Sequence, residues 1–275
     1  MLTNAKIKEI HKLNEKSKAR REAGLFVIEG PKMFMEAPLE WVKEVYVTQD
    51  FLDHIDKETC LSNPSDKGLS ISEMIGWMDH EIITTEQMAR ISDTQTPQGI
   101  LCILSTPSYT MKDILRRGVR SNGDGRRLVM VLEDIQDPGN LGTIFRTAEG
   151  AGASGIILSE GCVDIYNPKT VRATMGSIYR MPYIYTDDLS ARIAELKADG
   201  IKVYAAHLKG KKYHNEISYA DTAFLIGNEG NGLKEETADL ADEYVRIPME
   251  GELESLNASV AASVLMYEHY RKPEI

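Results

Sequence analysis

The 275-residue chain carries 32 lysines and arginines against 42 aspartates and glutamates, a formal net charge of −10 at pH 7. Hydrophobic residues make up 42% of the chain and charged residues 27%, which is typical of a globular protein long enough for two domains. The negative charge argues against a protein that coats nucleic acid with its whole surface, and no apolar run is as long as a membrane span requires.

The cysteines and histidines argue against a disulfide framework and against a metal site. Cys60, Cys102 and Cys162 are widely separated and form no C-x-x-C pair. The six histidines are equally dispersed, and we expect no cysteine or carboxylate at ligand spacing beside the pair His207 and His214. The amino-terminal residues lack the apolar core of a signal peptide. We therefore expect a cytoplasmic protein with reduced thiols.

The first hundred residues predict a small α/β unit in which helices and strands alternate. A polar helical stretch with few apolar residues comes first, and a short strand closed by glycine follows it. Pro31 suits the first turn of the next helix. β-branched residues favour a strand in the WVKEVYVT segment. The expected helices cover residues 4–23 and 85–91, and the expected strands cover 24–30, 41–48 and 100–104.

Positive charge is concentrated in two places despite the negative net charge. Residues 6–21 hold seven lysines and arginines, among them Arg20, against Glu9 and Glu15. From charge alone, an exposed amphipathic helix and a phosphate-binding arm are equally consistent with this segment. A second basic group, nearer the middle of the chain, consists of Arg116, Arg117, Arg120, Arg126 and Arg127.

The second half of the chain predicts a mostly parallel, doubly wound sheet that binds ligands beyond the carboxyl ends of its strands. Residues 106–126 predict a linker, because Pro107 and the SNGDG run favour turns. The unbroken apolar run at 128–132 is typical of a strand buried on both faces. A turn and helix cap at 137–140 open a helix that extends to about residue 150. Further strands are expected at 155–158, 183–185, 202–206 and 223–226, and further helices at 168–175 and 189–198.

Three polar loops follow the last predicted strands, and each leaves main-chain groups for a ligand. Gly227–Gly232 has three glycines in six residues, which suits a solvated turn or close contact between main chain and ligand. Pro248 ends the short apolar segment at 245–249. Ser255 or Asn257 can cap a last helix. Its expected apolar stripe consists of Leu256, Val260, Val264 and Leu265. Such loops suit a cleft for a flat ligand with polar edges, such as adenine.

Three motifs in this order and spacing resemble the signatures of the SpoU (TrmH-like) RNA 2′-O-ribose methyltransferases of the SPOUT superfamily. They are Asn140–Arg146 (N-x-G-x-x-x-R), Gly227–Gly232 (GNEGNG), and the IPM and SLNAS runs at 247–249 and 255–259. The segments FVIEGPKMFMEA and TPQGILCIL look like parts of the L30e-like substrate-binding domain that many such enzymes carry, which is a looser match. The resemblance covers essentially the whole chain.

The resemblance implies a fold that periodicity alone does not predict. It implies an α/β protein with a Rossmann-like parallel sheet and a C-terminal trefoil knot, plus a small α/β (L30e-like) N-terminal domain. Without it, an unknotted sheet is expected, because knots are very rare. The implied domains are an RNA substrate-binding domain at 1–105, a linker at 106–126 and a SPOUT methyltransferase domain at 127–275. The implied assembly is a homodimer formed through the knotted C-terminal domain.

The resemblance also implies the reaction and the residues that carry it. S-adenosylmethionine is the implied cofactor, no metal is required, and RNA is the substrate, with ribosomal RNA favoured over transfer RNA. Arg146 is implied in catalysis. A guanidinium is a poor general base, so we expect it to clamp the adjacent phosphate and stabilise the developing alkoxide, with the proton acceptor left open.

Further residues are implied around the cofactor and the RNA. Asn140, Glu229 and Asn257 are implied as orienting groups of the catalytic site, and Glu229 also as a complement to the positive sulfonium. Arg172 is a weaker candidate for RNA phosphate. The cofactor is implied to lie against Leu225, Gly227, Asn228, Ile247, Met249, Leu256 and Ala258.

Other functions stay open at this point. An RNA-binding protein without catalysis would keep the same fold, although the intact motifs argue against it. A transfer-RNA 2′-O-methyltransferase is the alternative within the family. A dinucleotide-dependent oxidoreductase ranks last, because DIQDPGN instead of G-x-G-x-x-G follows the first strand of the second half.

Overall fold

The computed structural model describes residues 2–55, 70–116, 125–252 and 255–271. The chain divides into two units, one of Met1–Pro107 with Tyr166–Tyr179 and one of Ser108–Ile165 with Arg180–Ile275. Cys60, Arg117 and Arg120 lie outside the described residues, as does all of the expected SNGDG turn except its last glycine. Within the described ranges, none of the helices is both long enough and apolar enough to cross a membrane.

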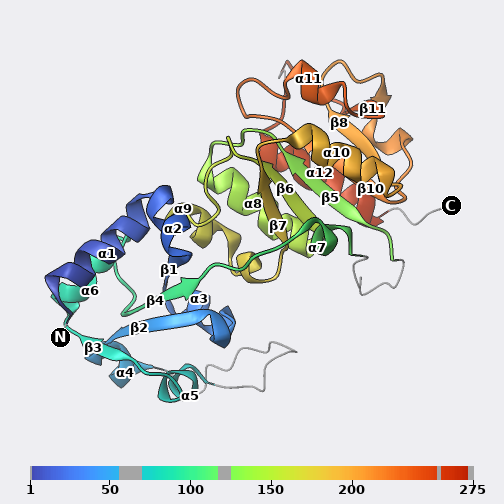
Figure 1. The fold of residues 1–275 in the computed structure, drawn as a ribbon. Helices are drawn as coiled ribbons and strands as arrows, with labels where there is room; N and C mark the ends of the chain where they lie inside the picture. Colours follow the sequence, from blue (N-terminus) through green and yellow to red (C-terminus); the bar gives the residue numbers. More distant parts are fainter. Residues whose placement is uncertain (1, 56–69, 117–124, 253–254, 272–275) are drawn as a thin grey trace. The chain divides into compact units, whose positions relative to one another are not determined.

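The described residues of the first unit build a mixed four-stranded sheet in the order β1-β4-β2-β3 (Figure 1). The outer strand β1 and the inner strand β2 run antiparallel to β4, whereas β2 and β3 are parallel. The strands are β1 (Leu25–Glu29), β2 (Val42–Thr48), β3 (Glu81–Ile83) and β4 (Ile100–Ser105). The helices are α1 (Asn4–Glu15), α2 (Ser17–Ala23), α3 (Pro31–Glu36), α4 (Gln49–His54), α5 (Ile71–Gly76) and α6 (Thr85–Ile91). The helices and strands expected in this part of the chain are confirmed, and β3, α4 and α5 are additions to them.

Arg20, which belongs to the basic segment at residues 6–21, has a structural role in the first unit. Its side chain is 3% exposed, and Nη1 donates to the carbonyl oxygens of Leu13 (2.6 Å) and Asn14 (3.0 Å). These are carbonyls of the last turn of α1, which have no partner inside the helix. Arg20 therefore fixes the corner between α1 and α2 and is not part of an exposed basic surface.

The segment Tyr166–Tyr179, with α9 (Pro168–Thr174), packs within the first unit although it follows β6 in sequence. The Tyr166 ring lies 4.3 Å from that of Phe26, and the Tyr179 hydroxyl donates to the Met33 carbonyl at 2.9 Å. Arg172, a weaker candidate for RNA phosphate, forms an ion pair with Asp93 at 3.0 Å.

The described residues of the second unit build a seven-stranded sheet in the order β7-β6-β5-β10-β8-β11-β9, and all its pairings are parallel. This confirms the expected parallel α/β arrangement. The strands are β5 (Leu128–Leu132), β6 (Gly155–Ser159), β7 (Tyr183–Thr186), β8 (Lys202–Ala206), β9 (Lys212–Tyr213), β10 (Thr222–Ile226) and β11 (Glu243–Arg246). The helices are α7 (Met111–Leu115), α8 (Pro138–Gly150), α10 (Leu189–Ala198), α11 (Glu235–Ala238) and α12 (Ala258–Arg271).

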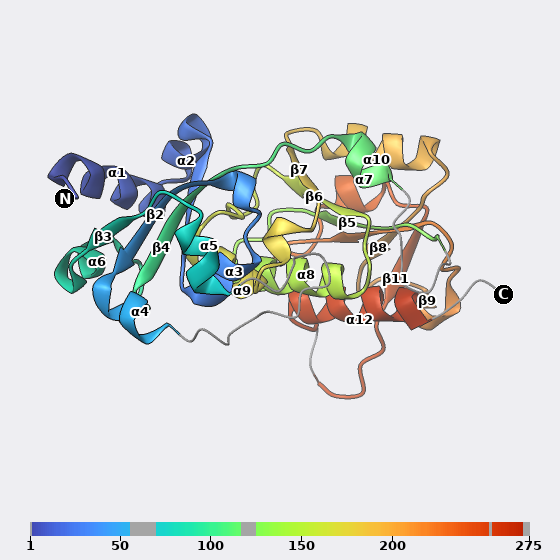
Figure 2. The same ribbon diagram turned by 90° about the horizontal axis from the view of Figure 1, so that it is seen from below.

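Helices cover both faces of this parallel sheet. Figure 2 shows α7 and α10 on one face and α8 and α12 on the other. Every residue of β5, β6 and β10 is buried, as expected for continuous apolar strands between two helical layers. On the α7/α10 face, Val129 and Val131 of β5 pack with Ile193 and Leu196 of α10. The sheet is therefore the centre of the core, and its strand ends are the places left for a site.

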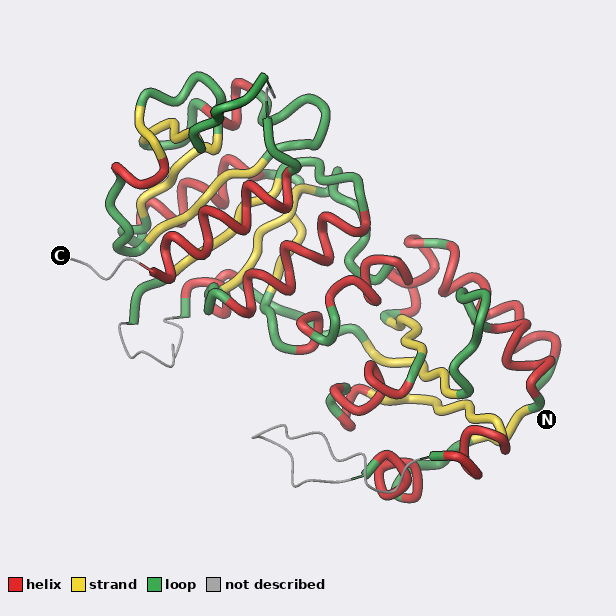
Figure 3. The backbone as a smooth tube through the Cα atoms, turned by 180° about the vertical axis from the view of Figure 1, so that it is seen from behind, coloured by secondary structure: helices red, strands yellow, loops and turns green. Residues whose placement is uncertain are grey.

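Of the apolar stripe expected on the last helix, Leu265 is buried as predicted and the other three residues are not. Leu256 precedes α12, Val260 is 47% exposed, and Val264 is half-buried. The buried face instead contains Ala258, Ser259, Ala262, Leu265, Met266 and His269. Small side chains on this face let α12 lie against α8, and Figure 3 shows the two helices side by side across the sheet. Close packing with α8 thus outweighs the burial of the larger valines.

Two arginines of the second basic group have structural roles. Arg126 and Arg127 are 5% and 6% exposed. Arg126 donates to the Tyr219 carbonyl at 2.7 Å, and Arg127 forms ion pairs with Asp199 and Asp221. These two guanidinium groups are therefore engaged within the second unit.

Candidate active site

The three motifs meet through the side chain of Asn140, which lies in the first turn of α8. Its Nδ2 donates to Glu229 Oε1 at 2.9 Å, and its Oδ1 accepts from Asn257 Nδ2 at 2.9 Å. Ser259 Oγ also lies near Asn140 Oδ1, at 3.3 Å. Each of these partners lies about ninety or more positions after Asn140 in sequence. One amide therefore joins the loop after β5, the loop after β10 and the start of α12.

Glu229 holds the turn before α8. Its two carboxylate oxygens accept from the main-chain N–H groups of Gln136 (3.1 Å) and Asp137 (3.0 Å), in addition to Asn140. Burial acts to raise the pKa of Glu229, but the hydrogen bonds from Asn140, Gln136 and Asp137 outweigh it and lower the pKa. The carboxylate is thus kept charged and fixed in place.

Asn257 is the cap of α12, one of the two caps expected. Its Oδ1 accepts from the N–H groups of Ser259 (2.9 Å) and Val260 (3.3 Å) and from Ser259 Oγ (2.7 Å). A cap of this kind satisfies N–H groups that have no partner in the first turn of a helix. Because the same amide donates to Asn140, the start of α12 is tied to the start of α8.

Arg146 lies on the exposed side of α8 and is not part of this network. It is six residues after Asn140, about 240° further around the helix, so the two side chains leave it in different directions. Within the described part of the chain, its guanidinium has no hydrogen bond or ion pair. The group is therefore available to an anion that approaches α8 from outside.

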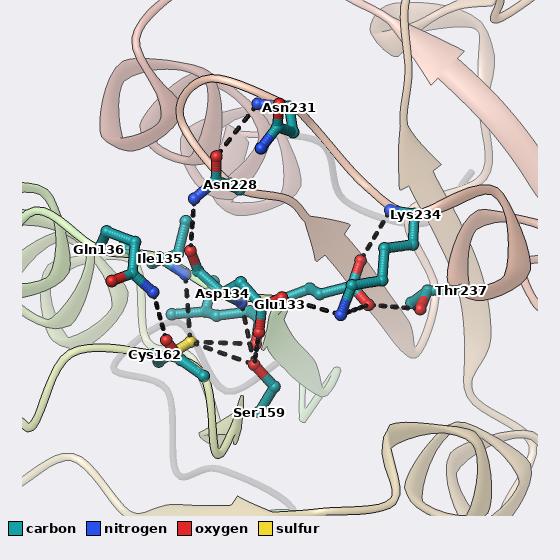
Figure 4. Close-up of polar contacts among 12 residues, drawn as sticks. Glu133, Asp134, Ile135, Gln136, Ser159, Cys162, Asn228, Asn231, Lys234 and Thr237 are labelled. Atoms are coloured by element: carbon teal, nitrogen blue, oxygen red, sulfur yellow. Dashed lines mark hydrogen bonds and ion pairs between the residues drawn. The ribbon is translucent and has the colours of Figure 1, made fainter.

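The residues between β10 and α11 form a tight turn, here called the glycine loop (Gly227–Leu233). Asn228 and Gly232 exchange both main-chain hydrogen bonds, at 3.0 and 2.9 Å. The Asn228 side chain accepts from Gly230 N and Asn231 N and donates to the Asp134 carbonyl at 2.8 Å (Figure 4). A Cβ on Gly227 would lie 2.1 Å from Gly232 C and Leu233 N, so only glycine fits there.

A cavity of about 290 Å³ lies between the glycine loop, the end of β8, the loop after β11 and the start of α12. Its wall is largely apolar, and main-chain groups of the glycine loop supply polarity, which is the usual character of a small-molecule site. The lining includes Leu208, Ile226, Leu233, Val245, Ala261 and Leu265, together with Glu229.

Six of the seven residues expected around the cofactor line this cavity. They are Gly227, Asn228, Ile247, Met249, Leu256 and Ala258. Ile247, Met249 and Leu256 lie in irregular segments, so strand or helix bonding does not occupy their main-chain groups. Leu225 is different: it is fully buried in the core between the sheet and its helices and does not line the cavity. Only from Ile226 onward does the chain leave the layered core and reach the cavity.

His207 lines the same cavity and has no counterpart among the expected residues. Its ring packs 4.9 Å from that of Tyr244, and its Nδ1 accepts from the Lys209 N–H at 3.1 Å. Burial is the main cause that lowers its pKa, and the Lys209 charge lowers it further. The position directly after β8, at the carboxyl edge of a parallel sheet, was the signal that could have identified it.

Glu133, Lys234 and Thr237 are also absent from the expected set. Glu133 and Thr237 are buried beside the glycine loop, and Glu133 accepts from the Thr237 hydroxyl and from the main-chain N–H of the exposed residue Lys234 (Figure 4). A carboxylate directly after the apolar run 128–132 was the signal for Glu133. Among the residues that the structure describes, no cluster of three or more His, Cys, Asp or Glu side chains could hold a metal ion.

Comparison with known families agrees with the placement of these motifs. A model of the SpoU rRNA Methylase family matches residues 127–267, which is more than half of the chain and includes all three motifs. The chain belongs to the SpoU rRNA methylase family. A second model, of the MRM3-like substrate binding domain, matches residues 4–102.

Relatives within the SpoU family share nearly the full length of the chain. The 23S rRNA (guanosine(2553)-2'-O)-methyltransferase RlmP of Bacillus subtilis is 30% identical over 265 residues, which are 96% of this chain and 95% of that protein. The solved structure of an AdoMet-bound rRNA methyltransferase from Sinorhizobium meliloti is 31% identical, with a TM-score of 0.79 and coverage of 98% and 96%. The structure of AviRb from Streptomyces viridochromogenes, at 24% identity and a TM-score of 0.79, shares the fold over 98% of both chains.

Proposed function

We propose that the cavity beside the glycine loop binds S-adenosylmethionine and that Arg146 meets the RNA substrate. The chain is an S-adenosylmethionine-dependent RNA methyltransferase that acts on a ribose 2′-hydroxyl. The observation that supports the placement is the pair of hydrogen bonds that Asn140 makes to Glu229 and Asn257, which brings all three motifs to one cavity. Ribosomal RNA is the proposed substrate, because a relative that shares nearly the full length of the chain is a 23S rRNA methyltransferase.

The cavity fits this cofactor by its chemistry. Apolar side chains such as Ile247, Leu256 and Leu265 suit the faces of an adenine ring, and the main chain of the glycine loop suits its polar edge. Glu229 provides a negative charge at the wall, which complements a sulfonium. When bound, S-adenosylmethionine supplies an activated methyl group.

The chain's own residues then orient the reacting partners. Glu229 and Asn257 fix Asn140, and their rigid network holds the glycine loop against α8. Arg146, exposed and without a partner among the described residues, is proposed to clamp the phosphate next to the reacting ribose and to stabilise negative charge on its oxygen. Holding both partners in line is worth several kcal/mol of barrier, so orientation is the main proposed contribution.

Assembly, domain roles and location complete the proposal. We propose an RNA substrate-binding, L30e-like domain at 1–105, a linker at 106–126 and a methyltransferase domain at 127–275, with a trefoil knot formed by the C-terminal segment. Support for the knot is the contact between Asn257 and Asn140, which places the segment before α12 beside the start of α8.

Exposed Val260, Tyr267 and Tyr270 on α12 support a homodimer through this region, because large apolar groups there suit a subunit interface. The proposed location is the cytoplasm.

Substitution of Arg146 tests the proposed division of roles. We expect Arg146→Ala to lower methyl transfer to RNA by at least a hundredfold while S-adenosylmethionine binds within twofold of wild type, because the side chain does not line the cavity. Arg146→Lys should restore little, because an ammonium cannot form the two parallel hydrogen bonds of a guanidinium. Labelled methyl transfer and calorimetric titration measure the two quantities. Unchanged turnover in Arg146→Ala would falsify the role.

A further inference from the structure

We propose that Glu133 is a positioning residue that holds the glycine loop in the shape that receives S-adenosylmethionine. The inference rests on the proposed placement of that cofactor in the cavity. Glu133 directly follows β5, is 3% exposed and does not line the cavity. It therefore acts through the residues that it holds.

Glu133 is bonded at both ends of the glycine loop. Its main-chain N–H donates to the carbonyl of Ile226, the residue before the loop, at 2.9 Å. Its side-chain Oε2 accepts from the N–H of Lys234, the residue after the loop, at 2.8 Å. One residue thus fixes the distance between the two ends of the loop.

The second carboxylate oxygen fixes the helix that follows. Glu133 Oε1 accepts from Thr237 Oγ1 at 2.6 Å, and Thr237 lies in α11 with 6% of its surface exposed (Figure 4). The Lys234 ammonium lies 3.6 Å from the same oxygen and 2.8 Å from Asp134 Oδ2. The buried carboxylate of Glu133 accepts hydrogen bonds from the Lys234 N–H and the Thr237 hydroxyl. It holds them firmly, because a buried donor that loses its acceptor costs free energy.

Asp134 adds a third point of attachment. Its φ of 54° turns the chain sharply after Glu133 and directs its carbonyl to Asn228 Nδ2, which donates at 2.8 Å. Its own carboxylate accepts from Ser159 Oγ at 2.8 Å, so the turn is also tied to β6. Two consecutive residues consequently hold the glycine loop just before its start, at its second residue and just after its end.

This arrangement predicts an effect on cofactor affinity and not on the chemical step. The glycine loop lines the cavity, whereas Arg146 lies on α8, outside the bonds of Glu133. If the anchor is lost, the loop must become ordered each time the cofactor binds, and that ordering weakens binding. At a saturating cofactor concentration the loop is ordered again, so turnover should recover.

The principal test is Glu133→Gln, which keeps the volume but replaces one acceptor oxygen by an NH2 donor that faces either Lys234 N–H or the Thr237 hydroxyl. We expect calorimetric titration to show at least a tenfold increase in the Kd of S-adenosylmethionine. The KM for the cofactor should rise in parallel, while the KM for RNA and kcat at saturating cofactor stay within twofold. Glu236→Gln, the same chemical change at an exposed position of α11, is the matched control.

A second pair of variants isolates one hydrogen bond and covers the case in which Glu133→Gln does not fold. Lys234 has φ −62° and ψ 143°, which proline can adopt. Lys234→Pro removes the N–H that Glu133 accepts, whereas Lys234→Met keeps it and removes only the charge. We expect Lys234→Met to bind the cofactor at least threefold more tightly than Lys234→Pro.

The outcomes separate this inference from the proposed function. If wild type binds S-adenosylmethionine but Glu133→Gln binds it within twofold, or if kcat falls while Kd is unchanged, the positioning role is wrong. The same holds if Lys234→Pro and Lys234→Met bind equally. If wild type itself binds no S-adenosylmethionine, the proposed placement of the cofactor fails first.

Discussion

Gly227→Ala should damage the cofactor site by displacing the glycine loop. The added Cβ would lie 2.1 Å from Gly232 C, 2.1 Å from Leu233 N and 2.3 Å from Gly232 O. These are main-chain atoms and cannot rotate away, and ordinary contacts between carbon atoms lie at about 3.5–4.0 Å, so the loop must move by about 1.5 Å. Overpacking of this kind costs about 1–3 kcal/mol. Because 1.4 kcal/mol is a factor of ten in affinity, we expect the Kd of S-adenosylmethionine to rise about ten- to a hundredfold.

A neighbouring glycine supplies the control for this prediction. A Cβ on Gly230 would meet only Asn228 Oδ1, at 3.6 Å, which is an ordinary contact. Calorimetric titration should therefore find Gly230→Ala much closer to wild type than Gly227→Ala. Thermal unfolding of each variant shows whether the fold is kept. If the two variants bind the cofactor equally well, close approach at Gly227 does not shape the site and the reasoning is refuted.

Two further predictions concern stability. The pKa of His207 is lowered below its ordinary value of 6.5, mainly by burial, so the neutral ring stabilises the fold above pH 6.5 and this stability is lost as the pH falls through the lowered pKa. Between pH 7.5 and 5.5, the Tm of wild type should fall by more than that of His207→Phe, which keeps a ring against Tyr244. Equal decreases in Tm would contradict this role of His207. Arg20→Met should lower the free energy of unfolding of the first unit by about 2 kcal/mol, because two carbonyls lose a charged donor. Lys12→Met, at an exposed position, is the control. If denaturant titrations give both variants the same free energy of unfolding, the structural role of Arg20 is refuted.

The elements of the second unit follow closely from local pattern. The helix at 189–198 and the strand at 202–206 have the expected limits, and β5, β6, β7 and β10 lie within a residue of their predicted positions. Continuous apolar runs between glycine-rich or polar turns identify strands that are buried on both faces, because no other element hides such a run. Short pieces such as β3, β9 and α11 carry too few residues for a period to be visible, so only their neighbours determine them.

The residues of the site were predicted from motifs, whereas the hydrogen bonds between them were not. Asn140, Glu229 and Asn257 were expected as separate orienting groups, but no sequence pattern shows that one amide bonds to both of the others. Leu225 was implied beside the cofactor by the family resemblance, and the structure places its side chain in the core and not in the lining of the cavity.

Local chemistry in the sequence determined the strands, most helices, the glycine positions and the order of the three motifs, because these depend on residues that are neighbours along the chain. Tertiary structure alone decided which groups share a hydrogen bond across ninety residues, which arginines are buried, and which face of α12 packs. Glu133 and Arg20 show the reason: the role of a charged side chain depends on the main-chain groups that folding brings to it, and their positions are set by the packing of the whole unit.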